Sequence, residues 1–253
     1  MVKKYLKQVF LFLGCTCIAL LASCGNDYRN GSYTIAYDPA WFGTELLGQQ
    51  NNVTGFSRDL LRELGKIEKI KLSFLAMSWD TLVPNLKSKQ YDAILSTLYP
   101  YLFNQTYFDF SSPYLLTGPV LVLPFNAQVK SIDDLNGAEI AVLPDTVGAI
   151  YLEKNPTILI RNYDSIPDAL NDIVAGNIQG AVVDVLVATA YCDNIYNGSL
   201  KVFGSPMNDN GLRLIVLEQT PPSSLVKAFE EGLMKLKKNG TYNKLLEKWS
   251  LGQ

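Results

Sequence analysis

The residue types in this chain limit its chemistry. None of the 253 residues is histidine, which removes the commonest general base, the commonest metal ligand and the usual partner of a serine or cysteine nucleophile. One cation, Arg213, stands inside the apolar stretch GLRLIV, where an unpaired charge would be costly. It must meet a ligand, form a salt bridge or extend to a sheet edge. These features favour binding over catalysis, and we expect no cofactor and no metal.

The overall composition is that of a globular protein with a substantial core, because 48% of the residues are hydrophobic and 18% are charged. The formal net charge is -2, and no run of lysine and arginine interrupts the sequence. Nothing therefore indicates a nucleic-acid partner.

Short apolar runs with strand character alternate with segments of helical period, which predicts an α/β fold. One round ends before Tyr114 and a second begins after it, so we expect two lobes. Each lobe should be a mostly parallel sheet flanked by helices, with the ligand site at the carboxyl ends of the strands. The predicted strands are 33–37, 71–76, 91–96, 118–123, 138–143, 157–163, 180–184 and 211–216. The predicted helices are 56–64, one that starts after a Ser78 cap, one capped by Thr146, one capped by Asp164 or Ser165, and 225–239.

The N-terminus has the features of a secretory signal, with three lysines before an apolar run too short to span a membrane as a mature helix. The run ends in LASCG, which resembles a bacterial lipoprotein signal. We therefore expect a signal peptide at 1–23, lipidation of Cys24 and a tether at 24–31; the alternative is a plain secretory signal with a chance cysteine. Cleavage would leave 19 basic and 24 acidic residues, and Cys192 as the remaining unmodified thiol.

Five phrases in order along the chain resemble the signatures of the extracellular solute-binding proteins that supply polar amino acids to ABC transporters. They are GFSRDLL (55–61), SWDTLVPNLKSKQYDAILS (78–96), FDFSSPY (108–114), YDSIPDALNDIVAGNIQGAVVD (163–184) and NGTYNKLLEKWSLG (239–252). The resemblance implies a type II periplasmic-binding-protein fold. Two lobes, 31–117 with 209–253 and 118–208, are joined by two crossover strands and close over a ligand by hinge motion.

The same resemblance assigns most of the candidate ligand contacts. Asp184 holds the place of the aspartate that binds the ligand ammonium, although an aspartate after a strand is also a common helix cap. Asp38 matches a pocket-lining position, with capping as an equal alternative. Trp41 and Trp79 match two aromatic walls, and for Trp79 the alternative is a core anchor on its helix.

The carboxylate contact is where the sequence departs from the family pattern. Asn104 stands where the family has an arginine that grips the ligand carboxylate with two parallel bonds, and Tyr99 replaces a threonine or serine. Thr97 takes the place of a small residue that offers backbone contacts, and Thr146 matches a threonine at a helix start that helps to hold the carboxylate. We hypothesise that Arg213 replaces the missing arginine.

The sequence thus predicts a monomeric, lipid-anchored solute-binding protein of an ABC importer, located on the extracytoplasmic face of a membrane. The expected ligand is a small polar molecule, an amino acid or an amine-bearing derivative, and the expected protein partner is the membrane permease. Two alternatives stay open: a non-transporting sensor or interaction protein, and a periplasmic dehydratase-like enzyme on the same scaffold.

Overall fold

The computed structural model describes residues 31–40, 46–218 and 223–252. Lobe 1 is built on a sheet of order β2-β1-β3-β11-β4, with β5 also paired to β11. Parallel pairing joins β1 to β2 and β3, whereas β11 runs antiparallel to β3, β4 and β5. The strands are β1 (Ser32–Tyr37), β2 (Lys71–Ala76), β3 (Ala93–Ser96), β4 (Phe108–Phe110), β5 (Leu115–Leu116) and β11 (Gly211–Leu217).

Lobe 2 is built on a second sheet of order β10-β6-β9-β7-β8. The strand β7 pairs parallel with β8 and β9, and β6 pairs antiparallel with β9 and β10. Its strands are β6 (Pro119–Pro124), β7 (Glu139–Val142), β8 (Leu159–Asn162), β9 (Gly180–Asp184) and β10 (Leu200–Phe203).

Both sheets are mixed, which corrects the expectation of mostly parallel sheets. The parallel pairs belong to the β-α-β units that the sequence alternation revealed. The antiparallel pairs come from strands that enter each lobe from the other one, such as β6 and β11, and so run against their neighbours.

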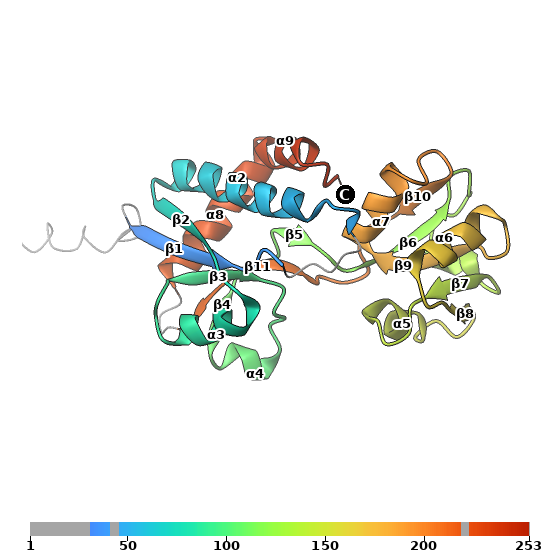
Figure 1. The fold of residues 1–253 in the computed structure, drawn as a ribbon, viewed down its shortest axis with the longest axis horizontal. Coiled ribbons are helices and arrows are strands. Elements are labelled where there is room, and N and C mark those ends of the chain that lie inside the picture. Colours follow the sequence, from blue (N-terminus) through green and yellow to red (C-terminus); the bar gives the residue numbers. More distant parts are fainter. Residues whose placement is uncertain (1–30, 41–45, 219–222, 253) are drawn as a thin grey trace, which may run out of the picture.

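Helices cover both faces of each sheet (Figure 1). In lobe 1, α2 (Gln50–Glu68), α8 (Ser224–Lys238) and α9 (Thr241–Lys248) lie on one face, and α3 (Trp79–Lys87) and the short α4 (Leu102–Gln105) lie on the other. Lobe 2 contains the 3₁₀ helix η2 (Ile132–Leu135) with α5 (Val147–Leu152), α6 (Ile166–Val174) and α7 (Val185–Asp193). The cap predicted at Thr146 is present, since its hydroxyl accepts from the Ala149 amide, and Ser165 rather than Asp164 caps α6.

Two crossing segments join the lobes and are hydrogen bonded to each other. The first runs from β5 to β6 and the second from β10 to β11; Gly211 pairs with Leu116, and the Thr117 amide donates to the Asn210 carbonyl at 2.8 Å. A Cβ at Gly118 would lie 2.2 Å from the Asn208 side-chain oxygen, so a larger residue there would have to displace the Asn208 side chain. The predicted lobe boundaries at 117/118 and 208/209 lie in these segments and stay predictions.

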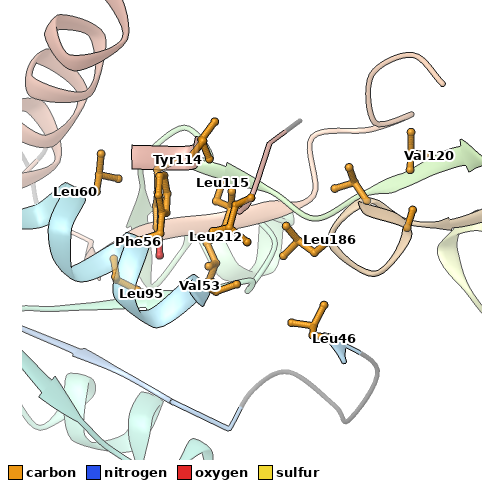
Figure 2. Packing of buried hydrophobic residues seen from close by; sticks show 14 of the residues in the cluster. Leu46, Val53, Phe56, Leu60, Leu95, Tyr114, Leu115, Val120, Leu186 and Leu212 are labelled. Atoms are coloured by element: carbon orange, nitrogen blue, oxygen red, sulfur yellow. The ribbon is translucent and has the colours of Figure 1, made fainter. Parts of the chain in front are cut away.

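The largest apolar cluster continues through the crossing (Figure 2). It includes Phe56 of α2, Leu115 and Leu212 on the crossing strands, and Val120 and Leu186 of lobe 2. Tyr114 is fully buried within it and its hydroxyl lies 2.9 Å from that of Ser57. Because one core holds both crossing strands, their positions are fixed where the candidate site residues emerge.

Candidate functional site

Lobe 2 brings two of the candidate residues into one pocket. Thr146, at the start of α5, and Asp184, at the end of β9, both line a cavity of about 70 Å³. Gly148 lines it too, and a Cβ there would lie 2.7 Å from Val182 Cγ1, so this wall requires glycine. The rest of the lining is mainly apolar: Pro119, Leu143, Ile166, Val182, Val183 and Val187.

Asp184 is exposed and precedes α7, but its side chain makes no capping hydrogen bond to that helix. Asp184 is thus the N-cap residue of α7 by position, without a capping bond from its side chain. Thr146 is engaged locally, since its hydroxyl donates to the Leu143 carbonyl at 2.7 Å and accepts from the Ala149 amide at 3.2 Å. Of the two, Asp184 presents the charge to the cavity, and Thr146 shapes the cavity wall.

In lobe 1, Asp38 and Trp79 follow the carboxyl ends of β1 and β2. Asp38 is only 7% exposed, and its carboxylate accepts the Ala40 amide at 2.8 Å, which is the turn-forming role. Trp79 is 50% exposed at the first residue of α3, while Leu82 and Leu86 of that helix are buried. Trp79 is therefore not a core anchor and remains available as a wall.

The segment after β3 uses its polar groups to hold its own shape. Thr97 and Tyr99 are half-buried, and the Asn104 side-chain amide donates to the Tyr99 carbonyl at 2.8 Å. This bond closes the turn over α4. The asparagine that replaces the expected arginine thus has a structural use here.

Arg213 is 4% exposed and belongs to a charged cluster near the start of β11, opposite Ser96. One guanidinium nitrogen (Nη2) donates to the Asp209 carboxylate at 2.8 Å and to its backbone carbonyl at 2.7 Å; the other (Nη1) donates to the Ser111 carbonyl at 3.2 Å. The Tyr99 hydroxyl donates to the second carboxylate oxygen of Asp209 at 2.9 Å. The alternative of a salt bridge for Arg213 is therefore present in this structure.

The cluster still has unused capacity for an anion. Arg213 Nε is buried without a hydrogen-bond partner among the described residues, and the guanidinium carbon lies 5.8 Å from the centre of the Tyr99 ring. Burial alone would raise the pKa of Asp209, but hydrogen bonds from Tyr99 and Arg213 outweigh it and lower that pKa, while the bond to Asp209 raises the pKa of Tyr99. Asp209 is thus an anion already held by Arg213.

Sequence reasoning did not single out Asp209. It lies four residues before Arg213, but the intervening chain is not helical, so no side-chain periodicity connects the two. An isolated arginine in an apolar strand was the available signal, and it indicated a partner without identifying it.

Arg213 also lines a cavity of about 440 Å³ on lobe 1. The other lining residues come from the 100–105 segment, β4 with the two serines after it, and α8: Pro100, Gln105, Phe108, Asp109, Phe110, Ser111, Ser112 and Glu230. Asp184 and Thr146 do not line it. Of the candidate residues that the structure describes, Asp184 and Thr146 thus share one cavity on lobe 2 and Arg213 lines another on lobe 1, and we call these two places the half-sites. The other described candidates line neither cavity: Asp38, Trp79, Thr97, Tyr99 and Asn104.

The aromatic stretch between Leu98 and Tyr107 is largely exposed. Tyr99, Tyr101 and Phe103 form a ladder with ring centres 4.8 and 5.5 Å apart, and Tyr101 and Phe103 are 55% and 66% exposed. The segment that follows it, FDFSSPY (108–114), joins the sheet through β4 and places Tyr114 in the core.

Some predictions fall outside the described residues, namely the aromatic wall at Trp41 and the lipidation of Cys24. Within the described residues, no group of three or more metal-ligating side chains occurs and no helix is long and apolar enough to cross a membrane. Cys192 is buried without a disulfide, and burial raises its pKa to about 11, so it is a poor nucleophile at neutral pH.

Two α/β lobes, two hydrogen-bonded crossing segments and polar half-sites at the strand ends define the class of two-lobed solute-binding proteins. Comparison with known families agrees: the model of the bacterial extracellular solute-binding proteins, family 3, matches residues 33–253. The chain belongs to this family and is a binding protein rather than an enzyme.

Relatives of known specificity are distant. The chain is 28% identical over 226 residues to the L-cystine-binding protein TcyJ of Escherichia coli, covering 87% of this chain and 83% of that protein. It is 26% identical over 209 residues to the E. coli ABC transporter arginine-binding protein 1, covering 81% and 85%. Among solved structures, the L-cystine solute receptor of Neisseria gonorrhoeae in its unliganded open conformation matches with a TM-score of 0.69 at 21% identity, covering 89% of this chain and 95% of that one.

Proposed function

We propose that this protein is the lipid-anchored substrate-binding component of an ABC importer and that it captures an amino acid or a related amine between its lobes by hinge closure. The relatives that support this proposal include an ABC transporter arginine-binding protein and an L-cystine-binding protein of E. coli. The observation that carries the proposal is the pair of half-sites, with a carboxylate at Asp184 on lobe 2 and a buried guanidinium at Arg213 on lobe 1.

The ligand class follows from these two charges. Asp184 receives the ligand ammonium, and the apolar wall around it accommodates the Cα region of a small ligand. A ligand carboxylate then competes with Asp209 for Arg213, because Asp209 holds Arg213 in the unliganded state. Ligands that carry an amine but no carboxylate avoid this competition.

Isothermal titration calorimetry with a panel of free amino acids, decarboxylated amines and short peptides tests the proposal. We expect at least one amine-bearing compound to bind, with binding weakened in an Asp184→Asn variant. If no member of the panel binds, or if the best ligand binds the variant equally well, the proposed site is wrong.

The anchor is tested separately. We propose that Cys24 is lipidated after cleavage of residues 1–23, and mass spectrometry of the N-terminal peptide from native membranes should give a diacyl or triacyl mass on Cys24. An N-terminal peptide that starts at another residue, or an unmodified Cys24, would contradict this part alone.

A further inference from the structure

One end of lobe 1 carries a basic groove that the proposed solute site does not use. It lies between the outer face of α2 and the edge strand β2, with a volume of about 680 Å³. Five exposed cations line it, above a base of Leu61, Ile70, Leu72 and Phe74: Arg58, Arg62, Lys66, Lys69 and Lys71. This concentration stands out because the chain after signal cleavage would have 19 basic and 24 acidic residues.

The groove keeps most of its positive charge. Lys66 pairs with Glu63 at 2.8 Å, and Arg62 pairs with the buried Asp59. Lys69 and Lys71 form no ion pair among the described residues. With five cations against Glu63 and Asp59, the groove presents net positive charge to solvent.

The groove lies beside the point where the tether enters the fold. Ser32 of β1 pairs with Lys71, and the Lys71 amide donates to the Gly31 carbonyl at 2.9 Å. Figure 1 shows that β1 and β2 begin, and α2 ends, at the end of lobe 1 that is remote from lobe 2. Cys24 precedes Gly31 by seven residues, which reach about 25 Å when fully extended. A lipid on Cys24 therefore holds this end of lobe 1 close to a bilayer.

We propose that the groove binds the anionic phospholipid headgroups of the membrane that carries the anchor, and that it orients lobe 1 with lobe 2 pointing away from the bilayer. The inference rests on the proposed anchor for the choice of partner. The tether contains one acid, Asp27, and one base, Arg29, so it adds no net charge of its own. Electrostatic attraction to anionic lipid acts within about a Debye length, roughly 8 Å at physiological salt, a distance that the tether permits.

The test is vesicle cosedimentation of the unlipidated chain starting at Gly25, which retains every residue of the fold described above. Vesicles of phosphatidylcholine with 30% phosphatidylglycerol are compared with pure phosphatidylcholine. We expect binding to the anionic vesicles alone, and loss of binding when salt is raised from about 0.05 M to 0.5 M, because the groove charges are solvent-exposed. Equal binding to both kinds of vesicle, or no binding to either, would overturn the proposal.

A matched pair of variants localises the effect. Lys69→Gln with Lys71→Gln removes the two unpaired cations of the groove, and Lys130→Gln with Lys154→Gln removes two exposed lysines of lobe 2. Each lysine near an anionic surface contributes roughly fivefold to the partition coefficient, so the groove variant should bind about 25-fold more weakly and the control within about twofold of the parent. If both variants lose vesicle binding equally, the groove is not the part of the protein that binds the anionic lipid.

Two further measurements separate this proposal from others. Solute binding by calorimetry should be unchanged in the groove variant, because none of its substitutions touches either half-site; failure of the solute site alone leaves vesicle binding intact. If sedimentation velocity shows self-association that the groove variant abolishes, while vesicle binding persists, the groove joins two copies of the chain and the membrane proposal is wrong.

Discussion

The two lobes differ in the residues that stand at the expected ligand contacts. On lobe 2, Asp184 is the residue that the sequence resemblance assigns to the ligand ammonium, and its side chain lines a small pocket and makes no capping hydrogen bond to α7. On lobe 1, Asn104 stands where the resemblance leads us to expect a carboxylate-binding arginine, and its side chain closes a turn. Arg213 is held by Asp209 of the chain itself. In the site that we propose, the ammonium contact is kept on lobe 2 and the carboxylate contact is rebuilt around Arg213.

The lobes differ for a physical reason. A carboxylate at the end of a buried strand, like Asp184, needs only that strand to position it. The guanidinium of Arg213 is buried on an interior strand, where Asp209 and Ser111 pair its two terminal nitrogens and the Tyr99 ring lies beside it, while Nε has no partner among the described residues. A ligand carboxylate that binds Arg213 Nη2 must therefore displace Asp209.

The largest effect should come from Asp184→Asn on lobe 2. Loss of a charge-assisted contact corresponds to about tenfold to a hundredfold in affinity for an amine-bearing ligand. Calorimetry measures this loss of affinity. Asp193→Asn is the control, because Asp193 is an exposed aspartate at the end of α7, the helix that follows Asp184. Equal losses in both variants would assign the effect to general charge rather than to the pocket.

Arg213→Gln should lower the affinity for carboxylate-bearing ligands by about tenfold or more and leave decarboxylated amines within about twofold. The reason is that only a carboxylate uses the guanidinium. Because Arg213 is buried, thermal unfolding must accompany the titration to show that the variant is folded. A uniform loss over both ligand types, in a folded variant, would remove Arg213 from the site.

Asn104→Arg introduces the arginine that the resemblance leads us to expect at this position, and it should raise the affinity for free amino acids by up to about tenfold. The gain is limited because the bond from Asn104 to the Tyr99 carbonyl is lost, which costs about 1 kcal/mol. Asn104→Lys is the matched control, since it adds the charge without the planar pair of donors. An unchanged affinity in the arginine variant would show that this segment no longer faces the ligand.

The smallest predicted effect is the pH dependence of the stability that the Asp209 carboxylate contributes. Its pKa is lowered in the folded protein, so its carboxylate contributes stability above its unfolded pKa of about 3.9, and this contribution is lost as the pH falls through the lower folded value. The Asp209 side chain is 58% exposed, so the contribution is below about 1 kcal/mol. Parent and Asp209→Asn should differ slightly in Tm at pH 7 and converge once the pH falls below the lowered pKa of Asp209 in the folded protein. A difference that grows toward low pH would reverse the assigned sign.

The fold could be predicted from the sequence because the signals were local. Strands 71–76 and 180–184 have the predicted bounds, since each is an apolar run ended by turn or helix-start residues. The helix predicted at 56–64 extends over Gln50–Glu68, because its polar first turn breaks the apolar period while the buried Val53 still packs below it. The antiparallel direction of β6 and β11 follows from where the chain crosses between the lobes, and the local hydrophobic pattern carries no information about those crossings.

The site could be predicted only in part. Asp184 and Thr146 follow strands in a family motif, and the structure brings both to one pocket. The role of Asn104 in its turn and the capture of Arg213 by Asp209 depend on where the crossing segment passes, which sequence spacing does not reveal. Exposure likewise decides between the two interpretations of Trp79, whose helical spacing suggested the core.

The most direct test of the rebuilt carboxylate contact is a crystal structure with the best ligand from the calorimetric panel. We predict that the ligand ammonium contacts Asp184 and that its carboxylate, if it has one, contacts Arg213, with Asp209 displaced from its 2.8 Å ion pair. A carboxylate-bearing ligand bound between the lobes with the Arg213–Asp209 pair intact and Asp184 facing solvent would contradict the account.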